Sequence, residues 1–395
     1  MLSPESSSAA SYRAGRYIIQ PTGYRAFLPA ALPPDPPVQI AGELQVWLSR
    51  ADRALGRLDG SIQTLPNPDL FTYMYVRKEA VLSSQIEGTQ SSLQDVLAAE
   101  AKMLSPDHPR DVGEVVNYVR AMNLGLKRLT ELPVSVRLIR EIHAELLKGV
   151  RGSHLTPGEL RTSQNWIGPS GCTLNEATFV PPPPHEVPEK LAELERFLHS
   201  DTGLPLLIKI GLAHAQFETI HPFLDGNGRL GRLLITFLLC EQRALLKPVL
   251  YLSYFFKQYR QQYYEHLQSV RDAGAWEQWL MFFLRGVVEV SAQATDTARR
   301  ILDLREAHRR AITDKFGRAA GNGHRVLERL YQHPIVSVKH LQGWIGTTYP
   351  AANDLVARMV ASDILREYTG QARNRRFSYQ SYIDLFHDAA PETTT

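Results

Sequence analysis

The sequence predicts a mainly α-helical protein with one β-hairpin flap and a small mixed module at its C-terminal end. Apolar residues recur at spacings of three and four through most of the chain, which is the helical period. Residues 158–184 break that period with Gly, Pro, Asn and β-branched residues, and two strand-like stretches follow the last helical segment. At 395 residues, with 44% hydrophobic and 22% charged residues, the chain can bury a core in two or three domains.

Charge and cysteine content narrow the class of protein. The 44 basic and 41 acidic residues give a net charge of +3, which is too balanced to indicate bulk polyanion binding. The two cysteines, Cys172 and Cys240, lie far apart and form no disulfide framework or thiolate metal site. The N-terminal residues have no apolar signal region, and no apolar run reaches about 18 residues. We therefore expect a cytoplasmic protein without membrane contact.

The N-terminal part reads as a disordered leader, an extended segment and then helices. The first fifteen or so residues are rich in Ser and Ala, and the proline-rich residues 23–40 predict an extended strap over a folded body. From about Glu43 a helix presents one apolar face, which is formed by Leu44, Trp47, Leu48, Ala51, Leu55 and Leu58. Further helices are predicted over residues 71–88, 92–104, 111–129 and 135–149, with Pro133 separating the last two.

The remaining elements follow in order. Residues 161–168 and 176–182 are the expected arms of the flap, and helices resume from about Pro188 to about Arg310. Residues 317–325 read as a linker or helix break. After them come three helices and two short strands around a Gly/Arg/Asn turn, which is the order of a winged helix, and Thr347 or Thr348 caps the third helix. Residues 387–395 read as a loose tail.

The stretch HPFLDGNGRLGR, residues 221–232, places small and charged residues between two apolar helices. Gly226 and Gly228 allow turns that other residues resist and let a ligand approach the backbone, and Asn227 can adopt a left-handed turn and donate its side-chain amide. The next helix begins near Leu230, and Arg229 and Arg232 lie three residues apart at its start. A helix start of this composition is suited to the phosphates of a di- or triphosphate.

Two further residues of the stretch carry chemistry. Asp225 would repel phosphate unless a Mg²⁺ ion lay between them, and one carboxylate plus phosphate oxygens is the usual Mg²⁺ arrangement. His221 can accept a proton from a hydroxyl at neutral pH. These parts suit transfer from a nucleoside triphosphate to a hydroxyl.

Simpler interpretations exist for the separate parts. A lone GNG is weak evidence, and the second one, at Gly321–Gly323, reads as a linker turn. His214 reads as a packed core histidine, and its spacing from His221 suits no standard metal site. The chain has no GxxxxGK[ST] loop.

At every specified position residues 221–232 match HxFx[DE]GNGRxxR, so the chain resembles the Fic family, whose members typically transfer AMP from ATP to a Ser, Thr or Tyr hydroxyl of a protein. The resemblance implies that His221 is the general base and that Asp225 binds Mg²⁺. The ATP-binding residues that the resemblance implies or suggests are Gly226, Asn227, Gly228, Arg229, Gly231, Arg232, Tyr263 and Tyr264. For the two tyrosines, aromatic core residues at helical spacing are an equal alternative.

The resemblance extends over about residues 20–385. Asn165, Trp166, Ile167 and Gly168 resemble the flap that aligns a target segment as an added strand. The implied domains are an N-terminal strap and helical region (1–110), a Fic catalytic core (111–290), a linker helix (291–320) and a winged-helix domain (321–388).

The early helix ends in a second pattern of the family, [ST]xxxE[GN], which Ser83, Glu87 and Gly88 fit. In the N-terminally inhibited class this glutamate pairs with the second arginine of the motif, here Arg232. An arginine held by a carboxylate cannot hold the γ-phosphate, so ATP would bind in an unreactive pose. The alternative is that the pattern merely marks a helix end, because Gly88 is a natural helix terminator.

Several functions stay open at this level. The target is a protein or the chain itself, a homodimer is allowed, and the same site suits UMP transfer or removal of AMP. A regulator that binds DNA through its winged helix and senses nucleotide is a further alternative. The basic residues 371–376 favour DNA, whereas the candidate recognition helix offers only Asn353 and Arg358 as base-reading side chains.

Overall fold

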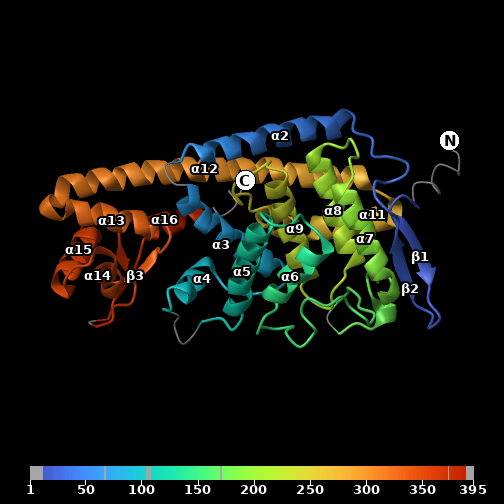
Figure 1. The fold of residues 1–395 in the computed structure, drawn as a ribbon, viewed down its shortest axis with the longest axis horizontal. Coiled ribbons are helices and arrows are strands. Elements are labelled where there is room, and N and C mark those ends of the chain that lie inside the picture. The colour runs from blue at the N-terminus through green and yellow to red at the C-terminus, as the bar shows by residue number, and fades with distance from the viewer. Residues whose placement is uncertain (1–11, 66–67, 104–107, 170, 372, 388–395) are drawn as a thin grey trace, which may run out of the picture.

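The structure is a computed structural model that describes residues 12–65, 68–103, 108–169, 171–371 and 373–387. The expected disorder of the leader falls almost wholly on residues 1–11, and the expected loose tail falls on residues 388–395; both lie outside the described residues. The described chain is mainly helical with two small sheets, so the predicted mainly helical class is confirmed (Figure 1).

Helices make up the body of the protein. They are α2 (Gly42–Gln63), α3 (Pro68–Ile86), α4 (Leu93–Glu100), α5 (Val112–Arg128), α6 (Val136–Leu146), α7 (Val187–His199), α8 (Leu206–Ile220), α9 (Asn227–Glu241), α10 (Ser253–Gln258), α11 (Arg260–Ala273) and α12 (Trp276–Lys315). The predicted apolar face of α2 is buried at Leu44, Leu48, Ala51, Leu55 and Leu58. No helix in the described part of the chain is long and apolar enough to cross a membrane.

Helices α8 and α9 lie in the middle of the bundle and bury almost their whole circumference. A helix that is apolar on all sides belongs in a core, and these two are packed against each other and against α3, α5, α6, α11 and α12. The loop between them therefore has both of its ends fixed by the core, which is the condition for a precise site.

Helix α12 is one continuous helix of 40 residues that runs along α2 (Figure 1). It crosses residues 290 and 291 without interruption, so the proposed boundary between core and linker helix falls within a single element. Its end connects to the C-terminal module, which lies at the opposite end of the molecule from strands β1 (Gly15–Ile19) and β2 (Arg25–Pro29) (Figure 1).

The proline-rich strap begins as a hairpin that the sequence did not predict. Strands β1 and β2 pair antiparallel from Gly15 opposite Pro29 to Ile19 opposite Arg25. The backbone N–H of Phe27 also donates to the carbonyl of Val180 at 2.9 Å, so the hairpin is attached to the flap.

The predicted flap hairpin is only partly regular. Ile167 and Phe179 exchange two backbone hydrogen bonds of 2.8 and 3.0 Å and form one isolated antiparallel bridge, with no named strand on either side. Prolines at 169 and at 181–184 explain the short ladder, because a proline has no N–H to donate.

The C-terminal module has the three helices and two strands that the sequence predicted, plus one short strand and one short helix. In chain order they are α13 (Ala320–Leu330), β3 (Ile335–Ser337), α14 (Val338–Ile345), α15 (Tyr349–Ala361), β4 (Arg366–Glu367), β5 (Arg376–Ser378) and α16 (Gln380–Ile383). The sheet order is β3-β5-β4, antiparallel throughout. Thr348 caps α15, as expected, by accepting from the N–H of Ala351.

The interpretation of Gly321–Gly323 as a linker turn is wrong, because these residues lie inside α13. Gly323 faces α12, where a Cβ atom would come within 2.8 Å of Ile312 and 3.0 Å of Phe316. Close packing of two helices thus outweighs the poor helix propensity of glycine here.

A glycine also sets the packing of α5 on α9, and its replacement gives a first prediction. A Cβ atom at Gly125 would overlap the ring of Phe237. We expect Gly125→Ala to lower the free energy of unfolding by about 1–3 kcal/mol, measured by urea denaturation. Gly56→Ala in α2 is the matched control, because no atom lies within 4 Å of its Cβ position and the change should stabilise by about 0.5–1 kcal/mol. Equal stability of the two variants would contradict the packing argument.

Candidate active site

The site is built on the loop that joins α8 to α9. Helix α8 ends at Ile220, and His221 follows as its C-cap in the left-handed conformation (φ 48°, ψ 61°). Gly226 precedes α9 with φ 79°, a conformation that glycine adopts without strain. Two left-handed residues thus reverse the chain within six positions and bring His221 close to the first turn of α9.

His221 has the properties of a proton acceptor. Its ring Nδ1 is buried and has no hydrogen-bond partner among the described residues. Burial, followed by the positive charges of Arg161 and Arg271, lowers the pKa of His221 to about 4. The imidazole is therefore neutral at pH 7, which is the state that a general base requires.

Asn227 acts differently from the prediction. Its Oδ1 accepts from the N–H of Phe223 at 2.9 Å, and its Nδ2 donates to the Phe223 carbonyl at 2.8 Å. The side chain therefore closes the loop and has no amide left for a ligand. The left-handed residue is Gly226 and not Asn227, which begins the helix.

Asp225 lies at the rim of the loop with its side chain 31% exposed. Its Oδ1 accepts from the N–H of Gly226 at 2.6 Å, and Nη2 of Arg229 is 3.6 Å away. A single, partly exposed carboxylate beside a helix N-terminus fits a Mg²⁺ ion that takes its other ligands from phosphate and water.

The two arginines of the motif do not point to one place. Arg229 is 1% exposed, and its Nη1 donates to Oε2 of Glu114 in α5 at 3.0 Å. Arg232 is 2% exposed and faces α3 instead. Arg229 is thus held between two carboxylates, those of Glu114 and Asp225, which favours a role in fixing the first turn of α9.

The contacts of Arg232 match the second sequence pattern. Its Nε donates to Oγ of Ser83 at 2.8 Å, and its Nη2 donates to the Ser83 carbonyl at 2.9 Å and to Oε1 of Glu87 at 2.7 Å. Burial opposes ionisation of Glu87, but the Arg232 guanidinium outweighs it and holds the pKa of Glu87 below its usual range. Gly88 follows with φ 96°, so the helix terminates where its sequence suggested.

The Glu87 carboxylate also covers the start of α9. A Cβ atom at Gly228 would clash with Oε1 of Glu87, so the carboxylate lies directly against the Gly228 backbone. An anion thus already occupies the N-terminal end of α9, where a helix favours negative charge.

Tyr263 and Tyr264 occupy different environments. Tyr263 is 1% exposed, stacks on Phe256 and donates to or accepts from Nε2 of His214 at 2.9 Å. This burial favours the core alternative for Tyr263. Tyr264 is 40% exposed and is the one of the pair that a ligand can reach.

His214 is the satisfied core histidine that the sequence predicted. It is fully buried, and its Nδ1 lies 3.0 Å from the carbonyl of Gly231. Gly231 itself packs on a carboxylate, since a Cβ atom there would clash with Oε1 of Glu218. Gly231 is thus a packing position one turn behind the helix start.

The flap residues lie beside the loop. Nδ2 of Asn165 donates to the carbonyl of Phe223 at 2.8 Å, and Trp166 and Ile167 are 43% and 37% exposed. A Cβ atom at Gly168 would come within 2.6 Å of the Cys172 sulfur. Asn165 therefore holds the flap to the loop, while Trp166 and Ile167 form its open surface.

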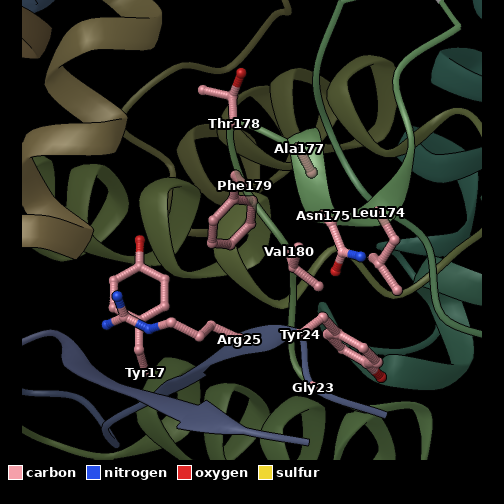
Figure 2. Close-up of a pocket in the computed structure, with 10 residues that line it drawn as sticks. All are labelled: Tyr17, Gly23, Tyr24, Arg25, Leu174, Asn175, Ala177, Thr178, Phe179 and Val180. Carbon is pink, nitrogen blue, oxygen red and sulfur yellow. The ribbon is translucent and has the colours of Figure 1, made fainter.

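A hollow of about 330 Å³ lies between the hairpin β1–β2 and the return arm of the flap (Figure 2). Its walls include Tyr17, Tyr24 and Arg25 from the hairpin and Asn175 and Phe179 from the return arm. The residues of the loop 221–232 do not line it, so this hollow is separate from the site around His221.

Three residues that sequence reasoning missed complete the site. Glu114 binds Arg229, and Arg161 bonds to the backbone of His221. His143 stacks on Phe223 with ring centroids 3.8 Å apart, accepts from the N–H of Gly158 and lies 2.9 Å from the carbonyl of Asp225. Of these three residues, only Glu114 could have been suspected from the sequence, because it is a charged residue beside the apolar face of a predicted helix.

The buried histidines predict a pH dependence of stability. Burial lowers the pKa of His143 to about 4 and of His214 to about 3, from 6.5, as it does for His221. Between pH 6.5 and 5 the unfolded chain binds protons that the folded chain does not, so the free energy of unfolding falls on acidification, by about 1.4 kcal/mol per pH unit for each histidine at most.

Thermal denaturation followed by circular dichroism from pH 7.5 to 5 measures this effect. We expect His143→Gln to reduce the slope of melting temperature against pH, and His185→Gln, which removes an exposed histidine, to leave it unchanged. An unchanged slope in both variants would contradict the assignment.

The fold is mainly helical. At its site, the carboxylate of Glu87 occupies the N-terminal end of α9, and the neutral imidazole of His221 lies on the loop before that helix. Two family models match the chain: one described as Fic/DOC family over residues 133–239, and one described as Fic/DOC family N-terminal over residues 47–127. Over these two segments the chain is similar to proteins of the Fic/DOC family.

Individual proteins show the same likeness. A probable protein adenylyltransferase of Aquifex aeolicus (strain VF5) is 31% identical over 175 residues, which are 43% of this chain and 49% of that protein. The protein adenylyltransferase Fic of Drosophila yakuba is 30% identical over 194 residues, 47% of this chain and 33% of that protein. The chain thus spans about half or less of the length of these curated relatives.

A solved structure supports the fold. The crystal structure of a Fic family protein from Desulfovibrio desulfuricans G20 has a TM-score of 0.57 and 20% sequence identity, and the match covers 87% of this chain and 97% of that one. The similarity in fold therefore covers most of the chain.

Proposed function

We propose that the protein is an adenylyltransferase that moves AMP from ATP onto a Ser, Thr or Tyr hydroxyl of a protein target, or of itself, and that Glu87 holds this activity back. The observation that carries the proposal is the Glu87 carboxylate, which lies on Gly228 at the start of α9 and 2.7 Å from Arg232. This carboxylate occupies a position that binds an anion. A phosphate group of ATP would bind at the same position once the Glu87 side chain is displaced. The names of the two relatives supply AMP as the transferred group.

The proposed reaction uses groups whose positions are known. The neutral imidazole of His221 accepts the proton of the target hydroxyl as its oxygen attacks the α-phosphorus of ATP. The bond between the α-phosphorus and the bridging oxygen to the β-phosphorus breaks, and pyrophosphate leaves. Backbone N–H groups of the first turn of α9 would stabilise the phosphates, and Arg232, released from Glu87, would hold the outermost one.

Mg²⁺ belongs to this proposal because Asp225 fits it. The ion would be held by the Asp225 carboxylate and phosphate oxygens, and when bound it would neutralise charge on the leaving group. Arg229 and its partner Glu114 keep the first turn of α9 in place beside this carboxylate.

The flap is proposed to align the target. The backbone N–H and carbonyl of Ile167 both bond to Phe179. Because backbone groups alternate along a strand, those of Trp166 and Gly168 point away from Phe179. An extended target segment would pair with that free edge and place its hydroxyl near His221.

We also propose that residues 320–386 form a winged helix. The order of α13, β3, α14, α15, β4 and β5 with a three-stranded antiparallel sheet supports this class. The two candidate base-reading residues are already engaged, because Asn353 accepts from Arg375 and Arg358 donates to Asp354. These contacts count against base reading by α15.

Labelled nucleotides test the function directly. Glu87→Gly protein with Mg²⁺ and lysate should become labelled, or label a target, from [α-³²P]ATP and not from [γ-³²P]ATP. Label from the γ-position would instead indicate phosphoryl transfer, and stronger label from [α-³²P]UTP would indicate UMP transfer. If protein that already carries the label loses it as free AMP after ATP is removed, water attacks the AMP ester and the site catalyses AMP removal instead.

A further inference from the structure

Arg161 lies at the base of the flap and is buried, with 2% of its surface exposed. Its Nε donates to the carbonyl of His221 at 2.9 Å, and its Nη2 donates to the carbonyls of Pro182 at 2.5 Å and Ile220 at 3.4 Å. Its backbone N–H donates to the carbonyl of Pro222 at 3.0 Å. One residue thus binds the end of α8, the catalytic loop and the return arm of the flap.

The partners of Arg161 are unusual for a buried cation. In the described part of the chain it has no carboxylate partner, and its hydrogen bonds go to neutral carbonyls. Burial lowers the pKa of Arg161 to about 10, so it still carries its charge at neutral pH. Burying a charge without a counter-charge destabilises a fold, so a cation kept this way indicates a use other than stability.

The backbone conformation of His221 suggests that use. A φ of 48° is uncommon for a residue other than glycine and requires support from its surroundings. The guanidinium of Arg161 holds the carbonyl of this very residue, and the carbonyl before it. The direction of the imidazole therefore depends on Arg161.

The charge of Arg161 acts on the same imidazole. After burial, Arg161 is the largest contributor to the lowered pKa of His221, followed by Arg271 from α11, whereas the carbonyl of Glu218 and the carboxylate of Glu87 from the end of α3 act in the opposite sense. Glu218, one turn earlier on α8, is a further titratable group in this region, and burial raises its own pKa to about 7.

We propose that Arg161 is a positioning residue that fixes His221 in its reactive orientation and joins it to the flap, so that base and aligned target hydroxyl meet. This rests on the proposed AMP transfer by His221. Arg161 touches neither nucleotide nor target in this role. It acts on the reaction through the backbone and the charge state of the base.

The test uses the full chain with Glu87→Gly as the parent. Into it we would introduce Arg161→Met, Arg161→Lys and, as the matched control, Arg137→Met, which removes an arginine that is 75% exposed on α6. Transfer from [α-³²P]ATP is measured as kcat, KM for ATP and kcat/KM from about pH 3.5 to 9, so that the range includes the pKa of about 4 of His221 in the parent.

We expect Arg161→Met to lower kcat about 100-fold, because a misplacement of about 1 Å can have that effect, while KM for ATP changes little. Its acidic limb of kcat/KM should move to higher pH, toward the ordinary pKa of histidine. Arg161→Lys keeps the charge but not the forked geometry, so kcat should fall while the acidic limb stays near that of the parent. Arg137→Met should match the parent in both.

An unchanged kcat in both Arg161 variants would overturn the proposal, and so would a raised KM with unchanged kcat. NMR titration of the His221 ring in the parent and in Arg161→Lys and Arg161→Met gives a readout that needs no turnover. If the parent transfers no label, the proposed function is contradicted, but the titration still tests the role of Arg161. A His221 ring with the same pKa and the same chemical shifts in the parent, Arg161→Lys and Arg161→Met would refute the positioning role. If Arg161→Met does not fold, Arg161→Lys decides alone.

Discussion

Replacing Glu87 by glycine should raise the rate of AMP transfer by roughly 5- to 150-fold, the range of typical coupling energies of about 1–3 kcal/mol between two sites. The substitution removes the carboxylate from Gly228 and from Arg232 together. The anion-binding position beside Gly228 is then free, and the guanidinium of Arg232 can bind the terminal phosphate of ATP. Initial rates with [α-³²P]ATP, together with calorimetric ATP binding, measure the effect.

Three companion variants sharpen this experiment. Ser83→Ala removes one hydrogen bond to Arg232 and leaves Glu87 in place, so it should activate less than Glu87→Gly. Glu87→Gln keeps the shape without the charge and should fall between the two. Glu159→Gly is the control, because this glutamate forms a surface ion pair with Arg140, away from Glu87 and Arg232. A Glu87→Gly rate equal to that of the native chain would remove the inhibitory role of Glu87.

The second large effect concerns His221. In the Glu87→Gly background, His221→Ala should lower transfer by about 10²- to 10⁴-fold, which is the usual contribution of a general base. The affinity for ATP should stay within a few-fold, because the phosphates are expected at the first turn of α9 and not at the imidazole. Calorimetry on the same protein measures that affinity.

His185→Ala is the matched control for this variant, since His185 is 74% exposed and lies near the flap. Transfer that persists in His221→Ala at more than a tenth of the parent rate would contradict the assignment of the base. Loss of ATP binding together with loss of transfer would instead assign His221 to the nucleotide pocket.

The parts of the site that could be predicted are those whose residues lie close together along the chain. Residues 221–232 are contiguous, so a turn followed by a helix could be predicted without knowing the fold, although the helix begins at Asn227 and not near Leu230. The contact of Glu87 with Arg232 joins residues 145 positions apart, and it was expected only through the family resemblance. Local spacing carries no information about such a pair.

Other parts could not be predicted because tertiary packing assigns them. Arg161 and Glu114 are ordinary charged residues of a loop and a helix until folding brings them against residues 220–229. Asn227 was expected to serve the ligand, but the loop uses both ends of its side chain. Gly323 was expected in a turn, and the close approach of α12 keeps it in a helix.

The pair of Glu87 and Arg232 lies within one chain, and this determines how it responds to concentration. In the proposed inhibition, this tethered carboxylate would compete with the γ-phosphate at an effective concentration that the intervening fold sets, typically in the millimolar range or above. Dilution of the protein does not weaken such a competitor, and an excess of ATP must overcome it anew in every molecule. If Glu87 inhibits transfer as proposed, the resting activity at a given ATP concentration would be a fixed fraction of the full activity, independent of the protein concentration.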